Sequence, residues 1–133
     1  METSVSRSAG KTRVWYRLAI VYFVVATAIG LYMGITGSHG LIPVHAHLNL
    51  LGWASLALTG LLYDRFPAAT STRLYPIHFW VYNLTLPVAM LTLALLLLRG
   101  IEALVPIVGI VSLVLFASIV TFAVNIWRSS RAS

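Results

Sequence analysis

The sequence predicts an all-α integral membrane protein, folded as a four-helix up-down transmembrane bundle. Hydrophobic residues make up 59% of the 133 residues and charged residues only 9%, a composition that a water-soluble domain of this size cannot shield from solvent. Residues 18–38, 41–63, 74–98 and 103–127 form charge-free apolar runs, each as long as the roughly 20 residues that a helix needs to cross the hydrocarbon core. We therefore expect helices at about 14–37, 42–64, 74–98 and 103–127, in one domain that covers residues 1–133.

The first helix follows a basic segment, as the apolar part of a secretory signal peptide does, but its apolar run is too long for one. A signal peptide has roughly 7–15 apolar residues and then a small-residue cleavage site, and neither feature fits residues 18–38. This helix is therefore expected to be retained. Residues 1–11 and 129–133 are rich in serine and are expected to be short disordered tails.

Helices that follow one another in sequence are expected to be antiparallel neighbours. Pro43 lies where the first turn of the second helix begins, a position that tolerates its missing N–H. The connecting segments, residues 37–41, 64–73 and 99–102, are short, and short loops join adjacent antiparallel helices into one up-down bundle. Aromatic residues near one set of helix ends are expected to form an interfacial belt; they are Trp15, Tyr16, Tyr63, Tyr75, Trp80 and Trp127.

The distribution of basic residues predicts the orientation. Eight of the nine lysine and arginine residues lie before the first helix, in the second loop or after the fourth helix, and only Arg99 lies on the opposite side. The positive-inside bias then puts both termini in the cytoplasm, with the chain in the inner (plasma) membrane. The net charge of +6 is explained by this topology and by contact with anionic membrane lipid. No folded basic surface that would bind nucleic acid is indicated.

The strongest functional signal is the pair His45 and His47 at the start of the second helix. Imidazole binds metal ions and heme iron, and an ionisable side chain at membrane depth suggests a functional site. Successive residues of an α-helix rotate by about 100°, so these two side chains are expected on opposite faces, serving two sites or two neighbouring helices. His39 is expected in a solvated loop, and His78 is expected to be an interfacial histidine at the other side of the membrane.

The residues below the two histidines leave two interpretations open. In the simpler one, both imidazoles are hydrated at the headgroup level and bind nothing. In the other, small residues two turns below each histidine leave flat recesses that suit a porphyrin plane. The face of His45 continues through Asn49, Gly52 and Leu56, and the face of His47 continues through Leu51, Ala54 and Leu58.

The segment 44–53, Val-His-Ala-His-Leu-Asn-Leu-Leu-Gly-Trp, resembles the tenth helix of the catalytic subunit of heme-copper oxidases, in particular the C-type oxidases and the nitric oxide reductases. In that family the two histidines of this helix bind two hemes from opposite faces. The resemblance implies heme b as the cofactor of this chain. It also implies His45 and His47 as the heme ligands. Asn49, Gly52 and Ala54, on the two faces described above, are then expected close to the ring, and Arg99, with His39, is available near its propionates.

The resemblance covers only part of the family pattern. The oxidase subunit has twelve helices, a second histidine cluster for copper and a cross-linkable tyrosine, whereas this chain has four predicted helices and no such cluster. The family's helices form three arcs of four, so this chain is similar to a single arc. Three copies would restore a ring of twelve helices, which implies a homotrimer in which His45 of one subunit faces His47 of the next.

These observations favour a b-type heme protein that exchanges electrons with a redox partner or binds a small gas such as O2 or NO. Turnover of the gas is a weaker expectation. It would make the chain an oxidoreductase related to terminal oxidases or nitric oxide reductases, but it needs buried groups that carry protons. The only acids, Glu2, Asp64 and Glu102, lie at helix ends or in loops. Two alternatives stay open: a copper- or zinc-binding membrane protein with histidines from several subunits, and a non-catalytic accessory subunit of a respiratory complex that packs through Gly30 and Gly34. The lack of cysteine excludes thiolate ligands and disulfides.

Overall fold

The computed structural model describes the backbone of residues 2–131 and the side chains of residues 10–131. Within this part of the chain every regular element is a helix, which confirms the predicted all-α class. The elements in order are α1 (Glu2–Thr36), α2 (Ile42–His47), the π-helix η1 (Leu48–Ala54), α3 (Ser55–Arg65), the 3-10 helix η2 (Pro67–Ser71), α4 (Leu74–Arg99), the 3-10 helix η3 (Glu102–Leu104) and α5 (Val105–Ser130).

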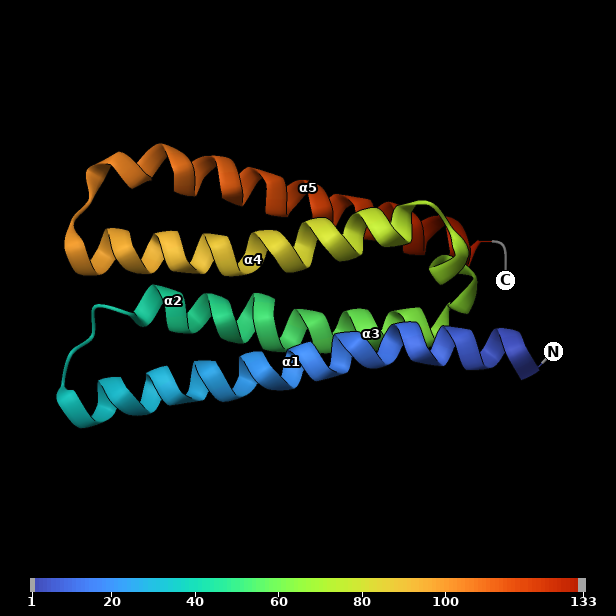
Figure 1. Cartoon of the computed structure of the whole chain (residues 1–133), viewed down its shortest axis with the longest axis horizontal. Coiled ribbons are helices and arrows are strands. Elements are labelled where there is room, and N and C mark those ends of the chain that lie inside the picture. The colour runs from blue at the N-terminus through green and yellow to red at the C-terminus, as the bar shows by residue number, and fades with distance from the viewer. Residues whose placement is uncertain (1, 132–133) are drawn as a thin grey trace.

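The helices form two layers (Figure 1). In the first layer α1 packs against the run formed by α2, η1 and α3, and in the second layer α4 packs against α5. The two ends of the chain and η2 lie at one end of the bundle, which we call the terminal end. The turns from α1 to α2 and from α4 to α5 lie at the opposite end, which we call the hairpin end.

Among the described residues, three helices are long and apolar enough to cross a membrane: Gly10–Thr36, Leu74–Arg99 and Glu102–Ser130. The predicted second helix is present as an unbroken helical run over residues 42–65, but a π-helix replaces its middle turns. Large apolar side chains remain exposed on the outside of the bundle, among them Val24, Leu61 and Leu113. So much exposed apolar surface is typical of a helical protein whose solvent is lipid.

The first helix begins earlier than the sequence predicts. It starts at Glu2, so the expected disordered tail is wrong for residues 2–11, and residue 1 lies outside the described part. Tertiary hydrogen bonds explain the order near the end of that segment, because the Lys11 ammonium donates to the Thr70 carbonyl at 2.7 Å and the Tyr75 hydroxyl donates to the Lys11 carbonyl at 3.1 Å. α5 likewise continues to residue 130, and residues 132–133 of the expected C-terminal tail lie outside the described part.

The two helices of the first layer approach closely because glycines on one helix receive rings from the other. A residue without a side chain lets a neighbouring ring lie against the backbone. The three pairs are Gly30 with His45, Gly52 with Tyr22, and Gly60 with Tyr16. In each pair a Cβ atom added to the glycine would lie 2.7 Å from the nearest ring atom. The helices would therefore have to separate to accept a larger residue at any of these positions.

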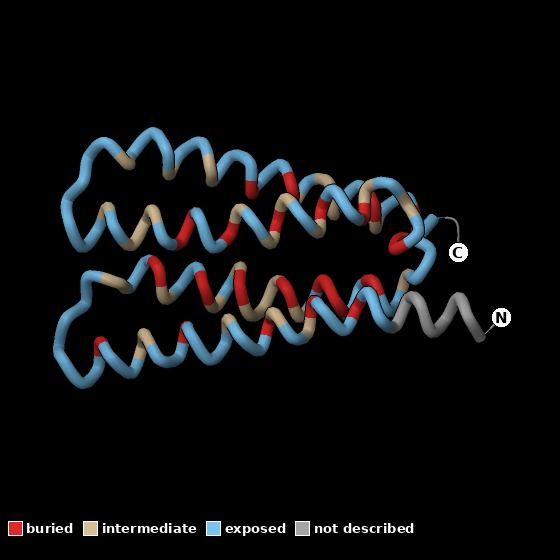
Figure 2. The backbone as a smooth tube through the Cα atoms, viewed as in Figure 1, coloured by how far each residue is buried: buried red, intermediate tan, exposed pale blue. Residues whose placement is uncertain are grey.

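Many of the buried residues lie toward the terminal end (Figure 2). His78 is only 1% exposed there, and its ring stacks between Trp15 and Phe122 with centroid distances of 4.9 Å to each. The Tyr63 hydroxyl lies 3.0 Å from Nδ1 of His78. The prediction of an interfacial His78 is therefore wrong, because α1, α3 and α5 all contribute rings around it. Trp15, Tyr63 and Tyr75, which were expected in the aromatic belt, also belong to the buried core.

Candidate functional site

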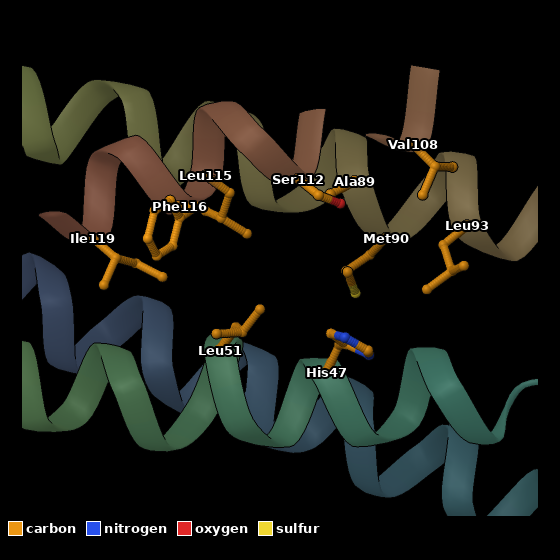
Figure 3. Close-up of a pocket in the computed structure, with 10 residues that line it drawn as sticks. All are labelled: His47, Leu51, Ala89, Met90, Leu93, Val108, Ser112, Leu115, Phe116 and Ile119. Atoms are coloured by element: carbon orange, nitrogen blue, oxygen red, sulfur yellow. The ribbon is translucent and has the colours of Figure 1, made fainter. Parts of the chain in front are cut away.

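The two histidines of α2 point to different neighbours, as their spacing predicts. His45 lies against α1, since its Nδ1 is 2.8 Å from the Ala26 carbonyl oxygen. His47 lies on the other side of the helix, where it faces the second layer across a cavity (Figure 3). One histidine therefore belongs to the packing of the first layer, and the other lies between the two layers.

The tautomer of His47 follows from its hydrogen bond. Its Nδ1 lies 2.7 Å from the carbonyl oxygen of Pro43 in the preceding turn. A carbonyl oxygen only accepts hydrogen bonds, so Nδ1 carries the proton and the lone pair of the neutral ring is on Nε2. Histidines that bind metals usually hold the other ring N–H on a carbonyl or carboxylate in this way. The ring of His47 is therefore prepared to act as a ligand through Nε2.

The cavity beside His47 has a volume of about 280 Å³, just below the ~300–1,000 Å³ that is usual for small-molecule sites. One wall comes from the first layer and the other from α4 and α5 (Figure 3). The lining residues are His47, Leu51, Ala89, Met90, Leu93, Val108, Ser112, Leu115, Phe116 and Ile119. No residue of the α5 segment 105–114 is buried. The His47 imidazole, the Met90 thioether and the Ser112 hydroxyl are the only lining side chains with a donor or acceptor atom.

His45 is enclosed by its own chain. Besides the contact with the Ala26 carbonyl, Nε2 lies 3.4 Å from Nδ2 of Asn49, and that amide also donates to the His45 carbonyl at 3.0 Å. The ring covers Gly30, whose added Cβ would lie 3.5 Å from Nε2. Both ring nitrogens of His45 are thus engaged within the first layer, and α1 would have to move before this residue could bind a metal or heme.

The recess expected beside Gly52 is not formed in this chain, because the ring of Tyr22 fills it. Ala54 is half-buried and does not line the cavity beside His47. Arg99 is exposed at the last turn of α4, outside the cavity lining. The structure therefore brings Asn49 together with His45, and it leaves Gly52, Ala54 and Arg99 away from His47.

The expected faces continue only in part below the histidines. Gly52 faces α1, as His45 does, and Leu51 lines the cavity with His47, but Ala54 and Leu58 do not. In η1 the Ser55 N–H bonds to the Leu50 carbonyl, five residues back, instead of four. This wider turn shifts every later residue relative to the face that a regular α-helix would give it. The Tyr82 hydroxyl of α4 donates to the Leu51 carbonyl at 2.8 Å and so ties η1 to the second layer. π-helical turns are frequent at functional sites.

A metal site built from the usual ligands is not found within the single chain. Among the described residues there is no group of three or more His, Asp, Glu or Cys side chains that could hold a metal ion. The cavity residue that sequence reasoning missed is Met90, since a lone methionine in an apolar helix carries no pattern. Only the register between α2 and α4 could have paired it with His47.

No family model matches the sequence, and neither a curated protein nor a solved structure matches it. The fold and the site by themselves define the class: an all-helical protein of transmembrane character, with an imidazole on the wall of an apolar cavity between its two helix layers.

Proposed function

We propose that this chain is a membrane-embedded b-type heme protein in which His47 is an axial ligand of the heme iron. The observation that carries the proposal is the fixed ring of His47, whose Nδ1–H donates to Pro43 and whose Nε2 is left for a ligand beside an apolar cavity. The donor chemistry of the lining suits heme, because it combines neutral imidazole with apolar walls and contains no carboxylate. The resemblance of the segment 44–53 to a heme-binding helix supports the same conclusion.

The chain's own residues orient the imidazole and give it apolar neighbours. The Pro43 carbonyl holds the ring of His47 in one orientation, and Leu51, Leu115 and Phe116 line the cavity with apolar surface. The α5 segment 105–114, of which no residue is buried, contributes Val108 and Ser112 to the opposite wall. When bound, heme iron supplies one-electron redox chemistry and an axial position that can take a small gas.

We further propose that all four helical runs span the inner membrane, with both termini in the cytoplasm. The run 42–65 lies alongside α1 (Figure 1) and is charge-free over residues 41–63. Basic residues at the terminal end include Lys11, Arg65 and Arg73, whereas Arg99 is at the hairpin end, a distribution that supports this orientation. A homo-oligomer, with a trimer favoured by the resemblance to one arc of the oxidase subunit, remains part of the proposal. An interface that pairs His45 with His47 of another copy is less well supported, because His45 packs on Gly30 of its own chain.

Binding of copper(I) is the second candidate, and one observation favours it. Met90 lines the same cavity as His47, and a thioether together with an imidazole is a donor set that suits Cu(I). Zinc is less suited to this cavity, since structural zinc sites use four ligands drawn from Cys, His and carboxylates.

The test is the heme content of histidine variants purified from membranes in mild detergent. His47→Ala is expected to lose heme, because the only imidazole on the cavity is removed. His39→Ala, which changes an exposed histidine at the hairpin end, is the matched control and should keep the wild-type ratio of heme to protein. His45→Ala should lower stability but keep heme. If His47→Ala keeps the full heme content with an unchanged spectrum, His47 is not the ligand and the proposal fails.

A further inference from the structure

An open groove lies between the two helix layers at the terminal end, apart from the cavity beside His47. Its volume is about 350 Å³, which is within the ~300–1,000 Å³ that is usual for small-molecule sites. The residues that line it are Gly10, Lys11 and Val14 from α1, and Tyr75 and Phe79 from α4. One wall thus comes from each layer, and a lysine is the only charged residue in the lining.

The groove is charged at its outer end and apolar at its inner end. Both α1 and α4 run from the terminal end toward the hairpin end (Figure 1). At ~1.5 Å per helical residue, Val14 lies about 4.5 Å deeper than Lys11, and Phe79 lies about 6 Å deeper than Tyr75. The deeper pair belongs to two helices that are apolar enough to cross a membrane. A phospholipid has the same polarity, with its phosphate at the interface and its acyl chains in the hydrocarbon core.

Contacts within the chain hold the Lys11 ammonium at the mouth of the groove. It donates to the Thr70 carbonyl at 2.7 Å and lies 5.4 Å from the centroid of the Tyr75 ring. Tyr75 is fixed in turn, since its hydroxyl donates to the Lys11 carbonyl at 3.1 Å and accepts from the Trp15 indole at 3.3 Å. A carbonyl oxygen and a ring face carry no net charge, so these contacts orient the ammonium without neutralising it.

The charges around the groove favour an anionic occupant. Among the described side chains, the only acid at the terminal end is Asp64, whose carboxylate accepts a hydrogen bond from the Tyr16 hydroxyl. The basic residues at the same end include Lys11, Arg13, Arg65, Arg73, Arg128 and Arg131. An ammonium has three N–H donors and forms strong charge-assisted hydrogen bonds with phosphate oxygens.

We propose that this groove binds one anionic phospholipid, with the phosphate on Lys11 and the first part of an acyl chain against Val14 and Phe79. The inference goes beyond the proposed function and does not depend on heme. Anionic lipids are concentrated in the cytoplasmic leaflet, which is where the proposed orientation puts the terminal end. A soluble acidic protein does not fit, because the apolar walls of the groove belong to helices with membrane-spanning character.

The test is native mass spectrometry of the full-length protein, delipidated in neutral detergent and titrated with phosphatidylglycerol. The wild type should bind one molecule per chain more tightly than it binds phosphatidylcholine, which has no net charge. Lys11→Gln should weaken this binding by a factor of about ten or more, because a charged hydrogen-bond donor is lost. Arg13→Gln is the matched control, since it removes the same charge from an exposed position outside the groove, and it should weaken binding by about fivefold at most.

A second variant fills the groove and leaves the charge unchanged. A Cβ added to Gly10 has nothing within 4 Å, so the side chain of Gly10→Leu can occupy the groove, and it should also weaken binding about tenfold or more. Gly34→Leu, which changes an equally open position at the hairpin end, should have no effect.

Two results would overturn the proposal. Equal weakening by Lys11→Gln and Arg13→Gln would show a general attraction of the basic end for anionic lipid and no defined site. Displacement of phosphatidylglycerol by inorganic phosphate or glycerol phosphate would show a site for a free anion, in which the acyl chain has no part. A protein that contains no heme but binds phosphatidylglycerol as described would refute the proposed function alone.

Discussion

The contact between Gly52 and Tyr22 gives the most quantitative prediction about the fold. In Gly52→Ala the new Cβ would lie 2.7 Å from Cγ of Tyr22, with Cβ and Cδ1 of the same residue at 2.8 Å. The optimal separation of carbon atoms is about 3.5–4.0 Å, so the two helices have to part by about 1 Å, a gap that forfeits about half of the attraction between facing atoms. Overpacking of this kind costs about 1–3 kcal/mol.

A matched glycine variant separates this cost from helix propensity. Gly34 lies in the last turn of α1 with nothing within 4 Å of an added Cβ, so Gly34→Ala should not be overpacked and should gain at most the ~1 kcal/mol that propensity gives in a helix interior. We expect Gly52→Ala to be less stable than Gly34→Ala by about 1–3 kcal/mol, measured by SDS-induced unfolding in detergent micelles. Tyr22→Ala should remove most of the penalty in the double variant, because the two residues are coupled. Equal stability of the two single variants, or no coupling to Tyr22, would refute the close approach of α1 and η1.

Two further predictions concern the terminal end and the orientation. Asn125→Ala should lower the free energy of unfolding by about 1–2 kcal/mol, because Asn125 is buried, donates to the Ala69 carbonyl at 3.0 Å and accepts from the Thr72 hydroxyl at 2.8 Å. Asn83→Ala is the control with a smaller expected loss, since the Asn83 amide donates only to the Phe79 carbonyl of its own helix at 2.8 Å and its Oδ1 is buried without a partner. Equal losses in both variants would contradict the network. In intact cells a membrane-impermeant thiol reagent should label a cysteine placed at Ser38 and spare one at Ser71, both of which are exposed positions, whereas the reverse pattern would invert the proposed topology.

The fold class could be predicted because it depends only on composition and on the length of apolar runs. The predicted boundaries of α4 agree with the structure almost to the residue, since charged residues and glycine mark its ends. α1 was expected to start at about residue 14, but it includes Lys11, because its ammonium and carbonyl find partners in η2 and α4. Such contacts join residues about sixty positions apart in sequence and cannot be inferred from local composition.

The candidate site was predicted only in part. The opposite faces of His45 and His47 follow from helical geometry, and the structure has them. The faces below them were extrapolated on a regular α-helix. Asn49 and Gly52 do lie on the α1 side with His45, and Leu51 lines the cavity with His47, but Ala54 and Leu58 do not, because the π-helix η1 shifts the later residues. Gly52 was read as a recess for a ligand, but a glycine equally well receives a ring of the same chain, here Tyr22. Sequence cannot distinguish these uses without knowing which helix packs against the glycine.

The burial of His78 was missed for a related reason. A histidine near a helix end among aromatic residues is typical of a membrane interface, and Trp80 of the same helix is indeed exposed. The residues that enclose His78, Trp15 and Phe122, come from α1 and α5. Their convergence depends on how the two layers pair at the terminal end, which hydrophobic periodicity does not specify.

The heme and metal content of one purified sample of the wild-type protein tests the central claim most directly. We expect iron and heme in equal amounts, close to one per chain, no stoichiometric copper, and a reduced-minus-oxidised spectrum with the sharp bands of a b-type heme. Copper bound in proportion to protein without heme would favour the second candidate. Protein that contains neither heme nor copper, although it is produced in cells well supplied with both, would contradict the assignment of His47 as a ligand.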